Sequence, residues 1–307
     1  MMKQLLILSG KGGTGKTTLA SSFIRLSQAE AYADCDVDAP NLHLVNSRAD
    51  EGVHTDYYGL AKAVIEQSKC QNCGQCAAQC VFQAIQTKEN HYQVDNYLCE
   101  GCAVCTLVCP HEAVTMQNMV AGEMVLYKQK PVFSTAQLKM GHGNSGMLVT
   151  QVKKAMKKAG KEAEVAIIDG SPGTGCPVIA SLSGVDMVLI VTEPSLAGMS
   201  DLQRIIQTAE IFKPQIAVCI NRYDTGLEQT AEIERFCELY GLPLVGKIPF
   251  DARAVAVVNQ GKALVELEDS PAAEAIQAVY EKTMGLLLHT EQKQEERENF
   301  AEKWLLW

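Results

Sequence analysis

The sequence predicts an α/β protein whose mostly parallel sheet is covered by helices on both faces, with a small inserted α+β domain. Three observations support this prediction. Short apolar segments alternate with helical segments along most of the chain, as in sheets built from strand–helix–strand units. A glycine-rich loop follows the first apolar segment. Two runs of cysteines interrupt the alternation between residues 70 and 109.

The first apolar segment, residues 3–8, is expected to be a buried strand, and residues 19–29 are expected to form a helix. The loop between them has the spacing G-x-x-x-x-G-K-T, which in this context is typical of a phosphate-binding P-loop, so the expected α/β fold is that of a P-loop NTPase. Its backbone N–H groups and Lys16 are expected to hold phosphate oxygens, and Thr17 to donate a hydroxyl ligand to Mg²⁺. The loop consists of Gly10, Lys11, Gly12, Gly13, Thr14, Gly15, Lys16, Thr17 and Thr18.

Lys11 makes the loop more specific, because Lys-Gly-Gly-x-Gly-Lys-Thr-Thr resembles the deviant P-loop of the MinD/ParA/Mrp ATPases in the CobQ/CobB/MinD/ParA nucleotide-binding family. The resemblance implies hydrolysis of ATP to ADP and phosphate in a nucleotide-dependent homodimer, with Lys11 reaching the partner's nucleotide. Residues 32–42, expected to follow the next short strand, resemble switch I of that family. Asp36 is then expected to orient or deprotonate the attacking water, and Asp38 to bind Mg²⁺ through water. A plain turn is the alternative interpretation of this segment.

A second acidic position comes at the end of the apolar segment 164–168. Asp169 and the turn that follows it resemble a Walker B aspartate and switch II, so Asp169 is a candidate Mg²⁺ ligand. Asn221, Arg222 and Pro249 follow two later apolar segments and resemble the base-binding positions of the family. Further strands are expected over residues 185–191, 215–220 and 244–248, and helices over residues 147–158, 200–212, 228–240 and 271–288.

The two cysteine runs have the spacing of a two-[4Fe–4S] ferredoxin, in which three cysteines of one run and the last cysteine of the other hold each cluster. Zinc is the alternative, but zinc sites usually take their ligands as two separated pairs. The one departure is Val81, where the second run has Pro110. Cluster 1 is assigned to Cys70, Cys73, Cys76 and Cys109, and cluster 2 to Cys80, Cys99, Cys102 and Cys105.

The expected domains are a discontinuous ATPase domain over residues 1–67 and 118–288, a ferredoxin-like insert over residues 68–117, and an amphipathic tail over residues 289–307. Within the insert, a strand is expected over residues 89–95. Each cysteine run is expected to be followed by a helix-like turn, at residues 81–85 and 110–114, so that the two halves form an internal repeat.

These features predict an ATPase that couples ATP hydrolysis and dimerisation to electron transfer through two [4Fe–4S] clusters, with ATP or ADP and Mg²⁺ as further cofactors. The expected partner is a redox protein or, if the chain is an iron–sulfur carrier, an apo-acceptor; a positioning ATPase with a structural insert is the third alternative. The net charge of −9 argues against nucleic-acid binding. The tail has five Glu against two Lys and one Arg, so membrane contact is not expected. No signal peptide is visible, which favours the cytoplasm.

Overall fold

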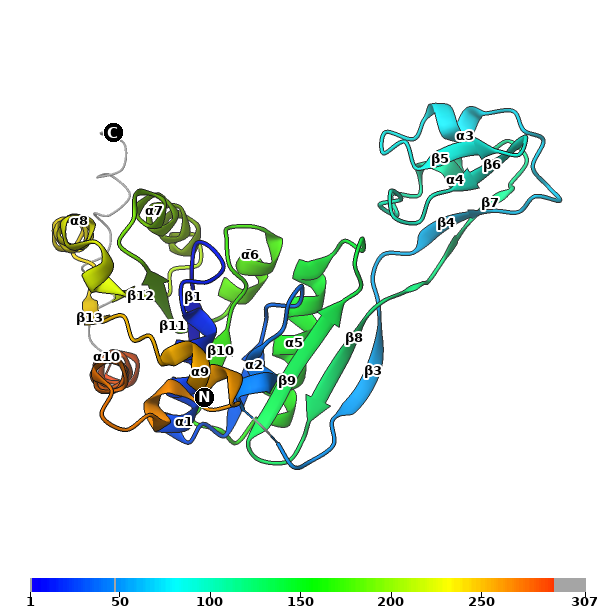
Figure 1. Cartoon of the computed structure of the whole chain (residues 1–307). Helices are drawn as coiled ribbons and strands as arrows, with labels where there is room; N and C mark the ends of the chain where they lie inside the picture. The colour runs from blue at the N-terminus through cyan, green and yellow to red at the C-terminus, as the bar shows by residue number, and fades with distance from the viewer. Residues whose placement is uncertain (1, 47, 290–307) are drawn as a thin grey trace.

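The computed structural model describes residues 2–46 and 48–289, and it contains a nine-stranded central sheet (Figure 1). The strand order is β13-β12-β11-β1-β10-β2-β9-β8-β3. The strands from β13 to β9 are parallel, and β8 and β3 add an antiparallel extension. The strands are β1 (Lys3–Leu8), β2 (Ala31–Asp34), β3 (Val53–Tyr58), β8 (Val120–Tyr127), β9 (Val132–Leu138), β10 (Val165–Asp169), β11 (Met187–Thr192), β12 (Gln215–Asn221) and β13 (Leu244–Ile248).

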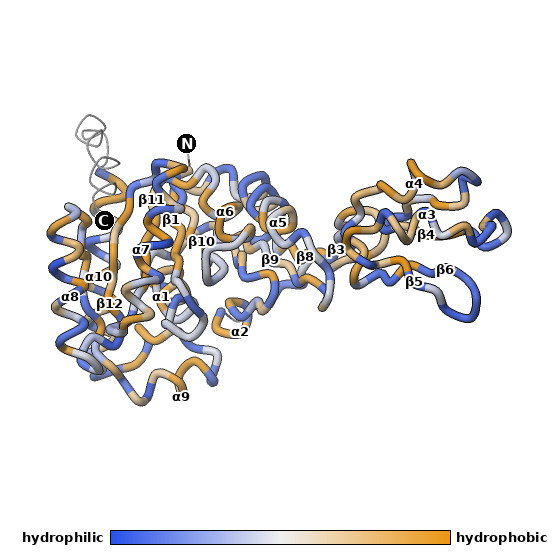
Figure 2. Tube along the Cα trace, turned by 90° about the horizontal axis from the view of Figure 1, so that it is seen from above, coloured by the Kyte–Doolittle hydropathy of each residue, from blue (hydrophilic) through white to orange (hydrophobic). Residues whose placement is uncertain are grey.

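Helices pack on both faces of this sheet because the side chains of each central strand alternate between two cores. In β1, Leu6 and Leu8 join one hydrophobic cluster, whereas Leu5 and Ile7 join the other. Figure 2 shows the hydrophobic strands β1 and β11 between the helices. One face carries α5 (Ser145–Ala159), α6 (Cys176–Leu182), α7 (Leu196–Glu210) and α8 (Leu227–Leu239); the other carries α1 (Lys16–Ser27) and α10 (Pro271–Leu288), with the short α2 (Leu42–Val45) and α9 (Ala254–Asn259) nearby.

The predicted α/β fold with a mostly parallel sheet is confirmed. Several predicted boundaries were wrong: β2 covers Ala31–Asp34, so the predicted switch I segment begins inside the strand. The helices α1 and α7 begin at Lys16 and Leu196 instead of at residues 19 and 200. The order of the strands places β1 between β10 and β11, and the carboxyl ends of β1, β10 and β2 meet at one edge. Ligands of open parallel sheets bind at this edge. Among the described residues, no helix combines the length and apolar character that a membrane span requires.

The cysteine segment, residues 62–117, stands apart from the central sheet. It lies at the end of a ribbon formed by β3 and β8 (Figures 1 and 2). It contains two small antiparallel sheets and two single helical turns. One sheet pairs β4 (Lys62–Ile65) with β7 (Val114–Gln117), so its first strand precedes residue 68. The other pairs β5 (Ile85–Lys88) with β6 (His91–Val94). The helical turns are α3 (Gln75–Ala78) and α4 (Val104–Leu107).

Two local predictions for this segment were wrong. The helical turns lie inside the cysteine runs, not after them at residues 81–85 and 110–114, because residues in the left-handed region, Gly74 and Ala103, start a turn between the cysteines. Residues 89–95 form a tight turn followed by β6 instead of one strand, since Glu89 and Asn90 both adopt positive φ. The predicted tail, residues 289–307, lies outside the described residues except for His289.

Candidate functional site

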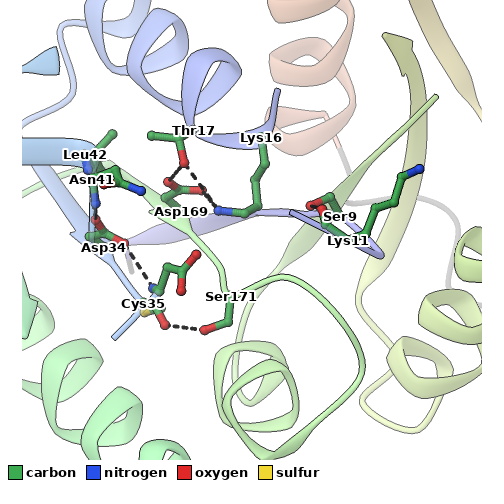
Figure 3. A network of polar contacts seen from close by, with 11 residues as sticks. Ser9, Lys11, Lys16, Thr17, Asp34, Cys35, Asn41, Leu42, Asp169 and Ser171 are labelled. Carbon is green, nitrogen blue, oxygen red and sulfur yellow. Dashed lines mark hydrogen bonds and ion pairs between the residues drawn. The ribbon is translucent and has the colours of Figure 1, made fainter. Parts of the chain in front are cut away.

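Lys16, Thr17 and Asp169 meet at the carboxyl ends of β1 and β10 (Figure 3). The Lys16 ammonium lies 2.6 Å from one Asp169 oxygen, and the Thr17 hydroxyl donates to the other at 2.7 Å. Both charged side chains are buried. Burial alone would lower the pKa of Lys16, but the Asp169 carboxylate outweighs burial and raises it. A hydroxyl and a carboxylate side by side are the hard oxygen ligands that Mg²⁺ prefers, so this pair fits the predicted magnesium site.

The glycines of the loop have the conformations that a phosphate cradle requires. Gly13 and Gly15 adopt φ values of 82° and 93°, a region that disfavours other residues. The buried Thr14 hydroxyl has no hydrogen-bond partner among the described residues, although buried polar atoms are nearly always paired. Asn221 fixes the same loop from β12, because its amide donates to the Thr14 carbonyl at 2.7 Å. An acceptor-rich ligand such as a phosphate would satisfy this orphaned hydroxyl.

The switch I loop is held by Asp34, a completely buried carboxylate at the end of β2. Its oxygens accept hydrogen bonds from the backbone N–H groups of Asp36, Asn41 and Leu42, each at 3.0 Å. Burial, and then the charge of Asp169, raise the pKa of Asp34 to about 7. The Asp34 carboxylate therefore holds the backbone of the predicted switch I loop at the end of β2.

Asp36 and Asp38 differ in their position relative to the P-loop. Asp36 is half-buried, and its negative charge contributes to the raised pKa of Lys16. Burial raises the pKa of Asp36, while the charge of Lys16 opposes that rise. Asp38 is exposed to solvent. Asp36 is thus the better placed of the two for chemistry beside the P-loop lysine.

Lys11 points away from Lys16 and Asp169 in Figure 3. Its ammonium forms an ion pair with Glu193, which follows β11, and Arg222 approaches the other oxygen of Glu193 at 3.9 Å. The Ser9 hydroxyl donates to the Lys11 carbonyl at 3.0 Å and fixes the backbone of this turn. The lysine that was predicted to reach a partner's nucleotide is therefore held at the protein surface by a carboxylate of its own chain.

A cavity of about 90 Å³ adjoins the P-loop, beside the ends of β12 and β13. Asn221, Arg222 and Pro249, the predicted base-binding residues, all line it together with Gly15 and Thr18 of the P-loop. Apolar side chains such as Leu264 and Ile276 form the rest of its wall. A flat, largely apolar ring next to a phosphate site fits this lining.

A second cavity gathers the four cysteines assigned to cluster 1. Cys70, Cys73 and Cys76 from the first run and Cys109 from the end of the second line one small cavity, as the crossed ferredoxin pattern requires. Burial raises the pKa of the Cys76 thiol, and the nearby sulfurs of Cys109 and Cys70 raise it further. The backbone N–H of Ala113 donates to the Cys109 sulfur at 3.3 Å.

Three of the other four cysteines, Cys99, Cys102 and Cys105 of the second run, also lie near one another. Burial raises the pKa of Cys105, and Cys99 and Cys102 contribute to the rise. The N–H of Ala84 donates to the Cys80 sulfur at 3.4 Å, which repeats the contact at Cys109. No group of three or more His, Cys, Asp or Glu among the described residues is placed to hold a single metal ion. The ligands of a cubane stand farther apart than those of one ion, so the crossed grouping around a cavity is the relevant test, and Cys70, Cys73, Cys76 and Cys109 fit it.

The sequence from residue 5 to residue 265 matches the family model of the CobQ/CobB/MinD/ParA nucleotide-binding domain. The chain belongs to this family. A protein of Methanocaldococcus jannaschii that is described only as uncharacterized is 30% identical over 92% of this chain and 96% of its own length. An iron–sulfur cluster carrier protein of Pyrococcus furiosus is 22% identical over 92% of this chain and 86% of its own.

The fold of the family is also seen in solved structures. The septum site-determining protein MinD of Pyrococcus horikoshii, complexed with Mg-ADP, superposes with a TM-score of 0.57 at 17% identity, over 93% of this chain and 97% of that one. At this identity the likeness establishes the shared MinD-like fold.

Two residues of this MinD-like site were missed by sequence reasoning. Asp34 lies in the predicted switch I segment, but no function was predicted for it from the sequence. Its position at the end of a strand and before the helix start at Asn41 and Leu42 could have indicated one. Glu193 gave no signal, because its contact with Lys11 joins positions far apart in sequence. Such a contact depends on the order of β1 and β11 in the sheet.

Proposed function

We propose that this chain is a MinD-like ATPase whose ATP binding, hydrolysis and dimerisation control electron transfer through two [4Fe–4S] clusters in the cysteine segment. The observation that carries the proposal is one connected structure with two sites. A Lys–Asp–Thr group beside a P-loop supports ATP and Mg²⁺. A crossed set of four cysteines around one cavity supports the clusters.

The residues of the P-loop would act on ATP in distinct ways. Lys16 would exchange its contact with Asp169 for the β- and γ-phosphates, and Thr17 and Asp169 would hold Mg²⁺. Asp36, a carboxylate with a raised pKa, is suited to orient water and accept a proton from it. Lys11 would leave Glu193 and reach the nucleotide of a second subunit. ATP-dependent dimerisation would therefore require breaking an ion pair that is partly exposed and weak.

Switch I is hydrogen-bonded to β9, the strand that pairs with the ribbon carrying the cysteine segment. The backbone N–H of Leu138 in β9 donates to the carbonyl of Val37 in switch I at 2.8 Å. Leu138 is paired with Gly122 of β8. β8 and β3 then lead to the sheet at the base of the cysteine segment. A shift of switch I on nucleotide binding would pull on this ribbon.

A second connection runs through residues 139–146, which comprise the loop before α5 and the first two residues of that helix. Gly146 packs against Cys176, the first residue of α6 after switch II; a Cβ at Gly146 would lie 3.1 Å from the Cys176 carbonyl oxygen. At its other end Gly141 lies against the Tyr97 ring, and Gly143 lies near the Glu100 carboxylate. The loop thus joins the region after the Walker B aspartate to the second cysteine run, and it is more than a plain connector.

The cysteines would hold the clusters as four soft thiolate ligands each, and the bound clusters would supply reversible one-electron storage. The chain contributes what surrounds them. Ala84 and Ala113 donate N–H bonds to sulfur, and Cys76, Cys99 and Cys105 are buried. Hydrogen bonds to sulfur and exclusion of solvent are the features by which a protein sets reduction potential.

An iron–sulfur carrier is the second candidate. Cys73 and Cys102 are exposed, which would allow attack by an acceptor's thiols, and carrier proteins are among the family relatives. Against this, Cys76, Cys99 and Cys105 are buried. The resemblance to Mrp-like carriers would also imply a Cys-x-x-Cys pair for a transferable cluster, and no such pair follows Cys109 in this sequence.

Anaerobic purification followed by EPR with and without Mg-ATP tests the proposal. We expect about eight irons per chain, two reducible centres, and a spectrum that changes when Mg-ATP binds. Two zinc ions without iron, or centres that do not respond to nucleotide, would contradict the proposal. Transfer of iron and sulfide to an apo-acceptor, with loss from the donor, would favour the carrier. ATP turnover that is indifferent to the oxidation state would favour a positioning ATPase with a structural insert.

A further inference from the structure

The cysteine segment contains one buried cation. Lys62 in β4 is 4% exposed, and its ammonium donates to the backbone carbonyl of Cys99, the first cysteine of the second run. Among the described residues no carboxylate forms an ion pair with Lys62. A buried lysine without a counter-ion is costly, because a charge removed from water loses its solvation. A carbonyl oxygen alone does not compensate that charge.

The other half of the internal repeat has no buried lysine at the position equivalent to Lys62. Cys70 corresponds to Cys99, and Lys62 in β4 corresponds to His91 in β6. His91 is exposed, so no buried cation stands at the equivalent place beside the first run. The two halves of the segment therefore share cysteine spacing and backbone contacts to sulfur but differ in buried charge.

A second lysine and a histidine lie on the same side. The loop of residues 139–146 places Lys139 and His142 near Lys62. Burial lowers the pKa of His142, and the positive charges of Lys62 and Lys139 lower it further. The Glu100 carboxylate faces the loop near Gly143. Of these groups, Lys62 is the one that is buried and bonded to a cysteine residue of the run.

We propose that Lys62 is a positioning residue that raises the reduction potential of the cluster held by Cys80, Cys99, Cys102 and Cys105 above that of the cluster held by Cys70, Cys73, Cys76 and Cys109. The inference rests on the proposed function. Reduction adds one negative charge to a cluster, and a nearby positive charge favours the reduced form. Burial strengthens this effect, because the interaction is not screened by water or salt. A segment that holds one electron would keep it on the second cluster, beside the loop that contacts the ATPase domain.

The test is a dithionite titration of the full anaerobic protein, monitored by EPR. In the wild-type protein we expect two separate midpoint potentials. Lys62→Gln keeps a hydrogen-bond donor but removes the charge. We expect this variant to lower the more positive midpoint potential, that of the second cluster, toward the potential of the first cluster. The potential of the first cluster should stay unchanged. Lys62→Arg keeps the charge and should preserve the separation. The separation should also persist at about 1 M salt, because a buried charge is poorly screened.

Lys69→Gln is the matched control. Lys69 is adjacent to Cys70, but its side chain is 54% exposed and paired with Glu66 at 2.7 Å, so its removal should leave both potentials unchanged. One common potential in the wild-type protein overturns the inference even if the Lys62 variants do not fold. Unchanged potentials in Lys62→Gln, or equal shifts of both, also overturn it, although the proposed function would stand. A wild-type protein without iron overturns both.

Discussion

Replacing Asp34 by alanine tests whether one buried carboxylate holds switch I in place. Three backbone N–H groups donate to it, each at 3.0 Å. Each such bond contributes about 1 kcal/mol net, so their loss is expected to cost about 3 kcal/mol of unfolding free energy. ATP hydrolysis should fall strongly, because Asp36 would lose the backbone contact that fixes its position.

The cost of the Asp34→Ala substitution should depend on pH. The pKa of Asp34 rises from 3.8 to about 7 on folding, so the folded protein retains a proton that the unfolded chain releases. The stability of the wild-type protein therefore declines as the pH rises from about 4 to about 7, and the alanine variant lacks this decline. At 1.36 kcal/mol per pKa unit, the deficit of the variant should shrink by about 1.4 kcal/mol between pH 6 and pH 8.

Urea unfolding of the Asp34 variants at pH 6 and pH 8, followed by far-UV circular dichroism, measures this change, and ATP turnover is assayed in parallel. Asp34→Asn is the control, since it keeps a carbonyl acceptor but cannot ionise. Its deficit in unfolding free energy relative to the wild-type protein should be smaller than that of Asp34→Ala, and it should shrink by the same amount between pH 6 and pH 8. A deficit that is equal at both pH values would refute the electrostatic reasoning, and wild-type turnover in Asp34→Ala would refute the role in the loop.

Three further substitutions test other parts of the structure. Lys16→Ala should abolish ATP turnover, and unchanged hydrolysis would count directly against the nucleotide site. Because the buried Asp169 charge loses its partner, the unfolding free energy measured by urea denaturation should fall by about 3–5 kcal/mol. Lys11→Ala removes a partly exposed ion pair, so stability should change by less than about 1 kcal/mol while hydrolysis falls and ADP binding, measured by calorimetry, persists. Gly122→Val would place a Cβ 2.6 Å from the Gln137 carbonyl and separate β8 from β9, so the EPR response to Mg-ATP should disappear with iron content and basal hydrolysis retained. Gly285→Ala, at an open helical position, is its control and should keep that response.

Much of the central fold could be predicted because its signals are local. β1 and β13 and the last described helix, α10, begin and end at the predicted residues, since each is a continuous apolar or amphipathic segment with clear turns at its ends. β3 was not predicted, because it is an antiparallel strand at the sheet edge with a mostly exposed, polar surface. Its assignment depends on pairing with β8, which is distant in sequence.

By itself the sequence determined which residues form the phosphate loop and how eight cysteines could be divided between two sites, because both patterns depend on spacing within a short stretch of chain. Only the tertiary structure decided which way the neighbouring charges face. It brings Glu193 to Lys11, aims Asp34 at the backbone of switch I, and buries Lys62 against Cys99. Each of these contacts joins separate strands or loops, so it exists only after the folded chain has brought those strands and loops together.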